Sequence, residues 1–331
     1  MSQSQIAVEF ADAELELSVR TALDAVEAAL RASVAADDEF VSVTARHLVE
    51  AGGKRFRPLL SVLAAHFGDP TTPELVPAAV VVEITHLATL YHDDVMDEAE
   101  VRRGTGSANA RWGNSVAILT GDFLFSRASN LLADLGPEAV RIQARTFERL
   151  VVGQIHETVG PPEGADPVEH YLGVLADKTG SLIATAAEFG ARFAGVDAAL
   201  VADLCEFGEQ IGIAFQISDD ILDIASESAE SGKTPGTDLR EGVATLPILY
   251  ARLGTDPTDA RLRELVSRPI ADDEELAETL QLLRRSDALV EARKTLQHYA
   301  DAARALLVKL PDCPARDALE TVVDLVVDRT G

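Results

Sequence analysis

The fold and the chemistry of this 331-residue chain are decided by the stretch Tyr91-His92-Asp93-Asp94-Val95-Met96-Asp97-Glu98-Ala99-Glu100-Val101-Arg102-Arg103-Gly104. An apolar, helix-patterned run leads into it, five carboxylates fall within eight residues, and two arginines follow. Because residues four apart share one face of a helix, Asp93 and Asp97 point the same way. Clustered carboxylates repel each other unless a cation lies among them. Hard oxygen ligands without Cys or His at ligand spacing favour Mg²⁺, which commonly bridges carboxylates to substrate phosphates. The alternative is a solvated acidic helix end.

A second acidic motif repeats the Asp-Asp-x-x-Asp spacing and weakens that alternative. Its sequence is Phe215-Gln216-Ile217-Ser218-Asp219-Asp220-Ile221-Leu222-Asp223. Here the carboxylates lie among Ile217, Ile221 and Leu222, a costly place for charge without partners. Two such helices facing each other would hold several divalent cations and one diphosphate.

The composition and net charge argue against some classes of binding partner. The chain is 47% hydrophobic, enough for a substantial core, and its formal net charge is −26. That charge argues against nucleic acid and against a polybasic contact with anionic membranes. Cys205 and Cys313 match no metal or redox spacing, which fits a reducing cytoplasm. We expect no signal peptide at the N-terminus and no apolar run near the roughly 20 residues of a membrane span, hence a soluble protein without stable membrane insertion.

Apolar residues at helical spacing predict an all-α chain, and alternating strand patterns are absent. The economical prediction is a single domain over residues 1–331, with residues 1–8 as a flexible tail. A Ser-, Gly-, Thr- and Pro-rich stretch, Ala225 to Asp238, predicts a mobile loop, and three or four helices follow it up to Val327. The helices predicted before that loop are Glu9 to Ala35, Phe40 to Ala51, Arg57 to Phe67, Glu74 to Asp97, Ser115 to Leu135, Glu138 to Val159, Asp166 to Asp177, Ser181 to Gly195, and Asp197 to Ile224.

Basic residues lie near the acidic motifs or at loop positions. Gly52-Gly53-Lys54-Arg55-Phe56-Arg57-Pro58 places glycines beside three cations at a helix start, where backbone N–H groups and basic side chains together make an anion site. A helix cap with solvated basic residues is the alternative there. The loop Gly232 to Asp238 does not fit the spacing of a nucleotide-binding P-loop, so ATP is not implied.

The motifs, in their order along the chain, resemble those of the trans-isoprenyl diphosphate synthases, the polyprenyl synthetase family. The resemblance covers about residues 50–250 and implies an isoprenoid synthase helical bundle around a central cavity, usually a homodimer. It is strongest to bacterial long-chain polyprenyl diphosphate synthases. The motifs that carry it are Gly52 to Pro58, His92 to Gly104, Gly121-Asp122-Phe123-Leu124, Lys178-Thr179-Gly180, Phe215 to Asp223, Gly232 to Leu239, and Thr245-Leu246-Pro247.

The resemblance also implies a role for each site residue in a head-to-tail (1′–4) condensation. Three Mg²⁺ ions would be held chiefly by Asp93, Asp97 and Asp219, with Asp94, Asp220 and Asp223 in support. The allylic diphosphate would contact Arg102, Lys178 and Lys233. The allylic cation would be stabilised by Thr179, Gln216 and the Lys178 carbonyl. Isopentenyl diphosphate would bind Lys54, Arg57, His86 and Arg103.

Product length is predicted from the residues one helical turn before the first aspartates, Ala88 and Thr89. Side chains there face the space into which the product would grow. In the family an aromatic residue there stops growth early, and here both side chains are small. We therefore expect products of about thirty-five to fifty carbons, for example a quinone side chain, by resemblance to long-chain synthases. A twenty-carbon geranylgeranyl product is the alternative, because a bulky residue deeper in the cavity could stop growth.

Two other classes of function share some of these features. A class I terpene cyclase also uses an aspartate-rich motif with Mg²⁺, but it needs no isopentenyl site, and the Gly52–Pro58 motif and the second acidic motif argue against it. A non-catalytic partner subunit of a heteromeric synthase commonly lacks one aspartate motif, and both are intact here.

Overall fold

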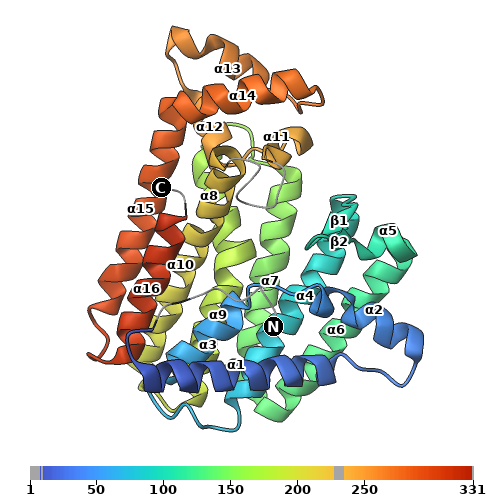
Figure 1. Cartoon of the computed structure of the whole chain (residues 1–331), viewed down its shortest axis with the longest axis vertical. Coiled ribbons are helices and arrows are strands. Elements are labelled where there is room, and N and C mark those ends of the chain that lie inside the picture. The colour runs from blue at the N-terminus through green and yellow to red at the C-terminus, as the bar shows by residue number, and fades with distance from the viewer. Residues whose placement is uncertain (1–7, 9, 227–234, 330–331) are drawn as a thin grey trace. The chain divides into compact units, whose positions relative to one another are not determined.

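The computed structural model describes residues 8, 10–226 and 235–329, and nearly all of its regular structure is helical (Figure 1). The first part of the chain forms α1 Ala13–Ser33, α2 Glu39–Glu50, α3 Phe56–Ala65, α4 Leu75–Met96, β1 Val101–Arg102, β2 Thr105–Gly106, α5 Ala108–Trp112, α6 Asn114–Leu135 and α7 Pro137–Val159. The second part forms α8 Pro167–Leu175, the π-helical turn η1 Ala176–Gly180, α9 Ser181–Phe193, α10 Ala198–Ala225, α11 Thr237–Glu241, α12 Leu246–Leu253, the 3₁₀ turn η2 Pro257–Asp259, α13 Ala260–Leu265, α14 Asp273–Arg285, α15 Asp287–Leu307 and α16 Pro314–Asp328.

The predicted all-α class is confirmed, and three details of the prediction were wrong. The short hairpin β1–β2 and the short helix α5 were not anticipated. More helices than the three or four expected follow the loop that ends at Asp238. The expected tail, residues 1–8, lies outside the described residues except for Val8, whose side chain is buried.

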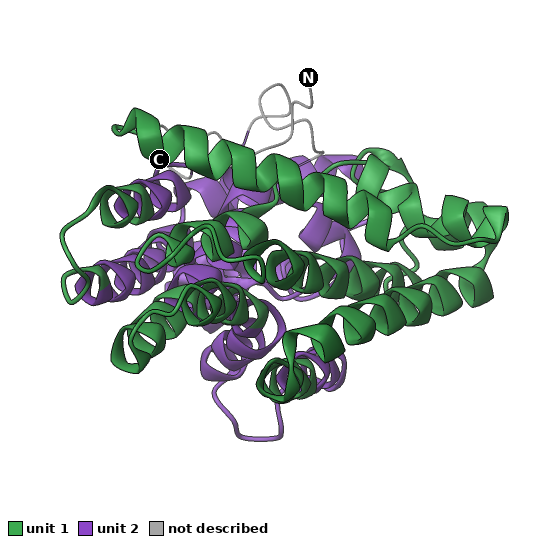
Figure 2. Cartoon of the chain, turned by 90° about the horizontal axis from the view of Figure 1, so that it is seen from below, with its two compact units in different colours: residues 1–148, 182–208, 307–319 green, residues 149–181, 209–306, 320–331 purple. Residues whose placement is uncertain are grey.

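The chain divides into two compact units, each built from discontinuous segments (Figure 2). Unit 1 contains residues 1–148, 182–208 and 307–319, and unit 2 contains residues 149–181, 209–306 and 320–331. The first acidic motif belongs to unit 1 and the second to unit 2. A single domain over residues 1–331 stays a prediction.

Aspartates fix the starts of several helices. Asp12 accepts a hydrogen bond from the Leu15 amide at 2.7 Å, and Asp38 accepts one from the Val41 amide at 2.9 Å. Asp272 accepts from two amides of the first turn of α14, each at 2.9 Å. A side-chain oxygen at this position satisfies an otherwise unpaired N–H group, and its loss typically costs about 1 kcal/mol. The acidic composition is thus used in part to define helix boundaries.

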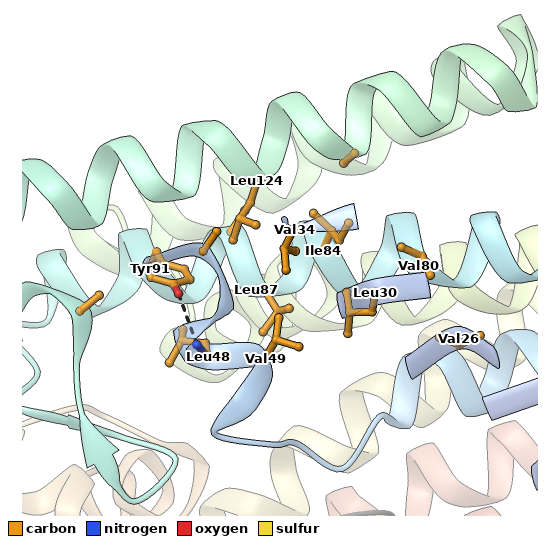
Figure 3. Close-up of a cluster of buried hydrophobic side chains, with 14 of the residues drawn as sticks. Val26, Leu30, Val34, Leu48, Val49, Val80, Ile84, Leu87, Tyr91 and Leu124 are labelled. Carbon is orange, nitrogen blue, oxygen red and sulfur yellow. Dashed lines mark hydrogen bonds between the residues drawn. The ribbon is translucent and has the colours of Figure 1, made fainter. Parts of the chain in front are cut away.

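The core of unit 1 is formed by α1, α2, α4 and α6. Figure 3 shows Leu30, Leu48, Ile84 and Leu87 among the buried side chains of this cluster. Tyr91 lies at its edge, where its hydroxyl donates to the Thr44 carbonyl at 2.5 Å and accepts from the Leu48 amide at 3.3 Å. These two bonds anchor the end of α4 directly before the first acidic motif.

Two glycines in unit 1 permit close helix contacts. A Cβ atom at Gly121 of α6 would lie 2.4 Å from His92 Nε2 and 3.1 Å from the Ala88 carbonyl oxygen of α4. A Cβ atom at Gly190 of α9 would lie 1.9 Å from the Ser61 carbonyl oxygen of α3, and the Ser61 hydroxyl donates to the Ala186 carbonyl at 2.8 Å. A side chain at Gly190 would force α3 and α9 apart, and one at Gly121 would displace the His92 ring and crowd α4.

The core of unit 2 gathers α12, α13, α14 and the end of α10. Its buried cluster comprises Ile224, Leu239, Ile248, Ala251, Leu262, Leu265, Val266, Ile270, Leu276, Leu280, Leu283 and Ala288. Arg284 of α14 donates to the carbonyls of Ile224 at 2.8 Å and Ser226 at 2.9 Å, which ties the end of α10 to this cluster. The second acidic motif is therefore carried by a helix whose end is anchored.

By length and composition α4 could cross a membrane, contrary to the expectation that no apolar run approaches that length. Its 18-residue apolar window is 67% buried within the structure, as in the core helix of a soluble protein. Since α4 also contributes Ile84, Leu87 and Tyr91 to the core of unit 1, its apolar character is explained by packing.

Leu87→Ala should lower the free energy of unfolding by about 2–5 kcal/mol, because Leu87 is completely buried and the substitution leaves a cavity. Urea unfolding followed by circular dichroism measures the change. Leu17→Ala on α1 is the matched control, since 69% of Leu17 is exposed and its loss should cost well under 1 kcal/mol. Equal losses from both variants would contradict the assignment of this core.

Candidate functional site

The first acidic motif occupies the C-terminal end of α4. Asp93 is half-buried, while Asp97 is exposed and follows the last residue of the helix, its amide donating to the Asp93 carbonyl at 2.8 Å. The last turn of α4 contains no basic residue. Because the C-terminal end of a helix carries partial negative charge, carboxylates there raise the local affinity for cations.

Asp94 differs from its neighbours because its side chain points into the protein. It is completely buried, and its Oδ1 accepts from Arg102 Nε at 2.6 Å. Its Oδ2 is also buried and has no hydrogen-bond partner within the described residues. Burial raises the pKa of Asp94 above its usual value, although Arg102 opposes that shift. Unlike Asp94, the Asp93 side chain is only half-buried and that of Asp97 is exposed at this end of α4.

A β-hairpin with a two-residue turn carries Arg102 and Arg103. Val101 pairs with Gly106 and Arg102 with Thr105, which leaves Arg103 and Gly104 as the turn. Both turn residues have positive φ, 53° for Arg103 and 74° for Gly104, as the tight hairpin turns that match strand twist require. The Arg103 guanidinium reaches back to the end of α2, where it donates to the Leu48 carbonyl at 2.9 Å and to the Gly52 carbonyl.

The three cations predicted near Gly52–Pro58 lie in different surroundings. Lys54 is exposed and Arg57 is half-buried, whereas Arg55 is buried in a left-handed conformation with φ 50°. The Arg55 guanidinium donates to Glu27 and to Glu83, both at 2.9 Å. Arg55 is thus a structural residue that fixes this loop, whereas Lys54 and Arg57 on either side of it are more exposed.

Arg57, His86 and Arg103 are brought together in unit 1 around one buried carboxylate. Burial lowers the pKa of Arg57 to about 10, although nearby Glu83 opposes that shift. Burial, and then the charges of Arg57 and Arg103, hold the pKa of His86 well below its ordinary value. His86 is therefore neutral near pH 7 and would contact an anion as a hydrogen-bond donor.

Sequence reasoning missed Glu83, which is buried and lies near Arg55, Arg57 and Arg103. Its signal was a carboxylate inside the apolar run of α4, three residues before His86. A charge placed there needs buried cationic partners.

The second acidic motif lies in α10, and each of its carboxylates has different partners. Asp219 is half-buried and forms an ion pair with Arg329, whose guanidinium also lies 4.9 Å from the centre of the Phe215 ring. Asp220 is buried and accepts from the Tyr171 hydroxyl and, at 3.2 Å, from Gln216 Nε2. Burial raises the pKa of Asp220 well above its usual value, with a further contribution from Asp238.

Asp223 connects this motif to the loop that follows. Its carboxylate accepts from the amides of Thr237 and Asp238, each at 3.2 Å. Asp238 is a second acidic residue that sequence reasoning did not assign, although the Gly232–Leu239 motif contains it. Lys233, predicted to bind the allylic diphosphate, lies outside the described residues.

Lys178 and Thr179 lie in the π-helical turn η1 of unit 2. The Lys178 ammonium forms an ion pair with Glu157 of α7.

The predicted chain-length residues lie in unit 1. Ala88 is completely buried in the core, and Thr89 is half-buried and donates from its hydroxyl to the His86 carbonyl at 2.8 Å.

The donor set fits Mg²⁺ that is shared with a substrate. Among the described residues, no three His, Cys, Asp or Glu side chains lie close enough to form a protein-only metal site. Mg²⁺ usually keeps several waters and binds one or two carboxylates together with substrate phosphates. The outward carboxylates Asp93 and Asp97 at the negative end of α4 offer such a partial set.

Comparison with known proteins agrees with these features. A family model described as polyprenyl synthetase matches residues 38–283. Nonaprenyl diphosphate synthase of Mycobacterium tuberculosis is 52% identical over 325 residues, which cover 98% of this chain and 97% of that protein.

Two solved structures are also similar. A geranylgeranyl pyrophosphate synthase from Corynebacterium glutamicum, complexed with calcium and isoprenyl diphosphate, has a TM-score of 0.88 and 47% identity, covering 98% of this chain and 100% of that one. A decaprenyl diphosphate synthase from Rhodobacter capsulatus has a TM-score of 0.87 and 34% identity, covering 96% of this chain and 99% of that one.

His86→Gln should reduce the loss of stability at acidic pH. The folded protein keeps His86 neutral, whereas the unfolded chain protonates it near pH 6.5. The unfolded state therefore binds more protons below that pH, and stability falls as pH is lowered through 6.5, by up to about 1.4 kcal/mol per pH unit for one proton. Urea unfolding between pH 5 and 8 measures the slope.

Replacement of the exposed His298 by Gln is the control for this experiment. The His86→Gln slope should be shallower than that of wild type, and the His298→Gln slope should match wild type. If His86→Gln kept the wild-type slope, the buried neutral imidazole would be ruled out.

Proposed function

The chain belongs to the polyprenyl synthetase family, and we propose that it condenses isopentenyl diphosphate with allylic diphosphates to make a long-chain trans-polyprenyl diphosphate of about thirty-five to fifty carbons. The observation that carries the proposal is the paired acidic motif with a separate cluster of cations around Glu83. An enzyme that joins two diphosphate substrates needs a binding site for each of them. Only the allylic substrate must ionise.

We propose that the acidic motifs serve the allylic substrate. Mg²⁺, three ions by family resemblance, would be held by Asp93, Asp97 and Asp219, supported by Asp94, Asp220 and Asp223. Bound there, it would neutralise the charge on the departing diphosphate. Arg102, Lys178 and Lys233 would contact the same diphosphate through their cationic groups.

Isopentenyl diphosphate would bind without metal on Lys54, Arg57, His86 and Arg103. This assignment is supported by the inward position of Arg55, which leaves Lys54 exposed and Arg57 half-buried on either side of it. Arg103 is held at the same end of α2 by the Leu48 carbonyl. Two cationic arginines and a neutral imidazole donor suit a diphosphate, which offers only acceptor oxygens.

The reaction then proceeds by ionisation, attack and proton loss. The bond between C1 of the allylic group and the diphosphate oxygen breaks, and both electrons leave with the oxygen. The Thr179 hydroxyl, the Gln216 amide oxygen and the Lys178 carbonyl would stabilise the cation through their negative dipole ends. The double bond of isopentenyl diphosphate forms the new bond from its C4, and its C2 loses a proton to the released diphosphate. Water must be excluded, because it would capture the cation.

Long products are supported by the small side chains of Ala88 and Thr89 and by the 52% identity to a nonaprenyl diphosphate synthase. A geranylgeranyl diphosphate synthase is the second candidate, favoured by the 47% identity to the Corynebacterium glutamicum enzyme. We further propose that the protein is a cytoplasmic homodimer and that its product supplies a quinone side chain.

Product analysis by mass spectrometry is the direct test. Purified protein would be given Mg²⁺, isopentenyl diphosphate and, in turn, ten-, fifteen- and twenty-carbon allylic primers. A ladder that ends at thirty-five carbons or more is expected, and it should vanish when Mg²⁺ is chelated. A stop at twenty carbons would favour the second candidate. No elongation with any primer would count against a synthase that acts alone.

Thr89→Phe should shorten the longest products by one or more five-carbon units, because a half-buried aromatic ring one helical turn before Asp93 would occupy the space for the growing chain. Thr89→Val is the matched control, since it keeps the size of the side chain and removes only the hydroxyl. An unchanged product ladder for Thr89→Phe would remove this residue from the product path.

A further inference from the structure

The proposed mechanism does not account for several contacts that hold the π-helical turn Ala176–Gly180 in place. It carries Lys178 and Thr179 and joins α8 directly to α9. π-helical turns are rare in proteins, and they occur frequently at functional sites. Such uncommon backbone persists where surrounding contacts over-determine it. The contacts of this turn with Arg149, Gly153 and Glu209 lie within unit 2.

Arg149 of α7 makes the polar contacts. Its Nε donates to Asp177 Oδ1 at 2.8 Å, and its two terminal nitrogens donate to the two Glu209 oxygens at 2.7 and 3.1 Å. A guanidinium that binds one carboxylate bidentately and a second through Nε is fixed in its plane. Asp177 directly precedes Lys178, so Arg149 holds the turn at the residue beside the proposed catalytic pair.

Two glycines bring neighbouring helices against the same turn. A Cβ atom at Gly153, one helical turn after Arg149, would lie 2.8 Å from the Lys178 amide nitrogen and 3.0 Å from Asp177 Cβ. A Cβ atom at Gly180 would lie 3.4 Å from the Glu209 carbonyl oxygen and 3.4 Å from its Cγ. The backbone of η1 is thus enclosed by α7 on one side and α10 on another.

We infer that Arg149 is a positioning residue for catalysis, which fixes the π-helical turn so that the Lys178 carbonyl and the Thr179 hydroxyl keep the orientation needed to stabilise the allylic cation. The inference rests on the proposed function. Arg149 acts through Asp177 and Glu209 and does not itself touch substrate. Gly153 is the steric counterpart, because only a residue without Cβ lets α7 approach the turn.

A purely structural salt bridge would behave differently. Side-chain exposure is 40% for Arg149, 29% for Asp177 and 27% for Glu209, and partly exposed ion pairs contribute little to global stability. Loss of Arg149 should therefore change the geometry of the turn more than the stability of the fold. Misplacement of a catalytic group by about 1 Å can lower a rate about 100-fold.

The experiment compares Arg149→Met with Arg145→Met, an exposed arginine one helical turn earlier on α7. Arg149→Met should lower kcat by about 10- to 100-fold, with an unchanged KM for isopentenyl diphosphate and nearly unchanged thermal stability. Arg149→Lys should recover little, because a single ammonium group cannot replace the planar fork. Arg145→Met should match wild type.

Hydrogen exchange and a second variant make the result independent of activity. In Arg149→Met the amides of residues 176–181 should exchange faster, while those of α9 beyond them keep wild-type protection. Gly153→Ala should also lower kcat, since its Cβ would displace the Lys178 amide without removing a charge.

Unchanged kcat in Arg149→Met would overturn the inference, as would a loss of kcat that only parallels a loss of thermal stability. An inactive wild-type protein would instead count against the proposed function, and it would leave the exchange measurement as the test of what holds the turn.

Discussion

The buried carboxylate of Glu83 is the charge on which the cation cluster of unit 1 depends. It accepts from Arg55 at 2.9 Å, and its charge acts on Arg57 and Arg103 as well. Without an internal negative charge, several guanidinium groups gathered beside α4 would repel each other and lose their hydration. With it, Arg55 is held in a structural position, and Arg57 and Arg103 remain charged and available to an anion. The proposed site for isopentenyl diphosphate is therefore organised around the buried carboxylate of Glu83.

The two acidic motifs share a spacing, but their carboxylates are not equivalent. In each motif the middle aspartate, Asp94 or Asp220, is buried and hydrogen-bonded to a side chain of the protein. Asp93, Asp97 and Asp219 are more exposed. The repeated spacing thus separates two positions: the inner carboxylate is buried and held by side-chain donors, and the outer ones, to which we assign Mg²⁺ in the proposed function, are less buried. On a helix, adjacent residues point about 100° apart, which is what allows this division.

Much of this was predictable, because helical periodicity, capping aspartates and motif spacing are local signals. Apart from the short α5, the helices up to α10 were placed within a few residues of their observed ends. The β1–β2 hairpin was missed because its strands are two residues long and its turn is Arg103-Gly104. The inward position of Arg55 and the burial of Asp220 depend on partners distant in sequence, Glu83 and Tyr171, which no local pattern specifies.

The close contact of α6 with α4 at Gly121 limits how enzymes of this kind can diversify. Because a Cβ atom at Gly121 would overlap His92 and crowd the Ala88 carbonyl, a larger residue at this position would displace the His92 ring or separate the two helices. Moving them apart would open the packed core around Leu87 and Leu124. If Ala88 and Thr89 line the product path, as proposed, a change of product size would therefore come from the exchange of individual side chains along α4. Such changes come in discrete increments of side-chain volume, so closely related sequences can differ abruptly in the products they release.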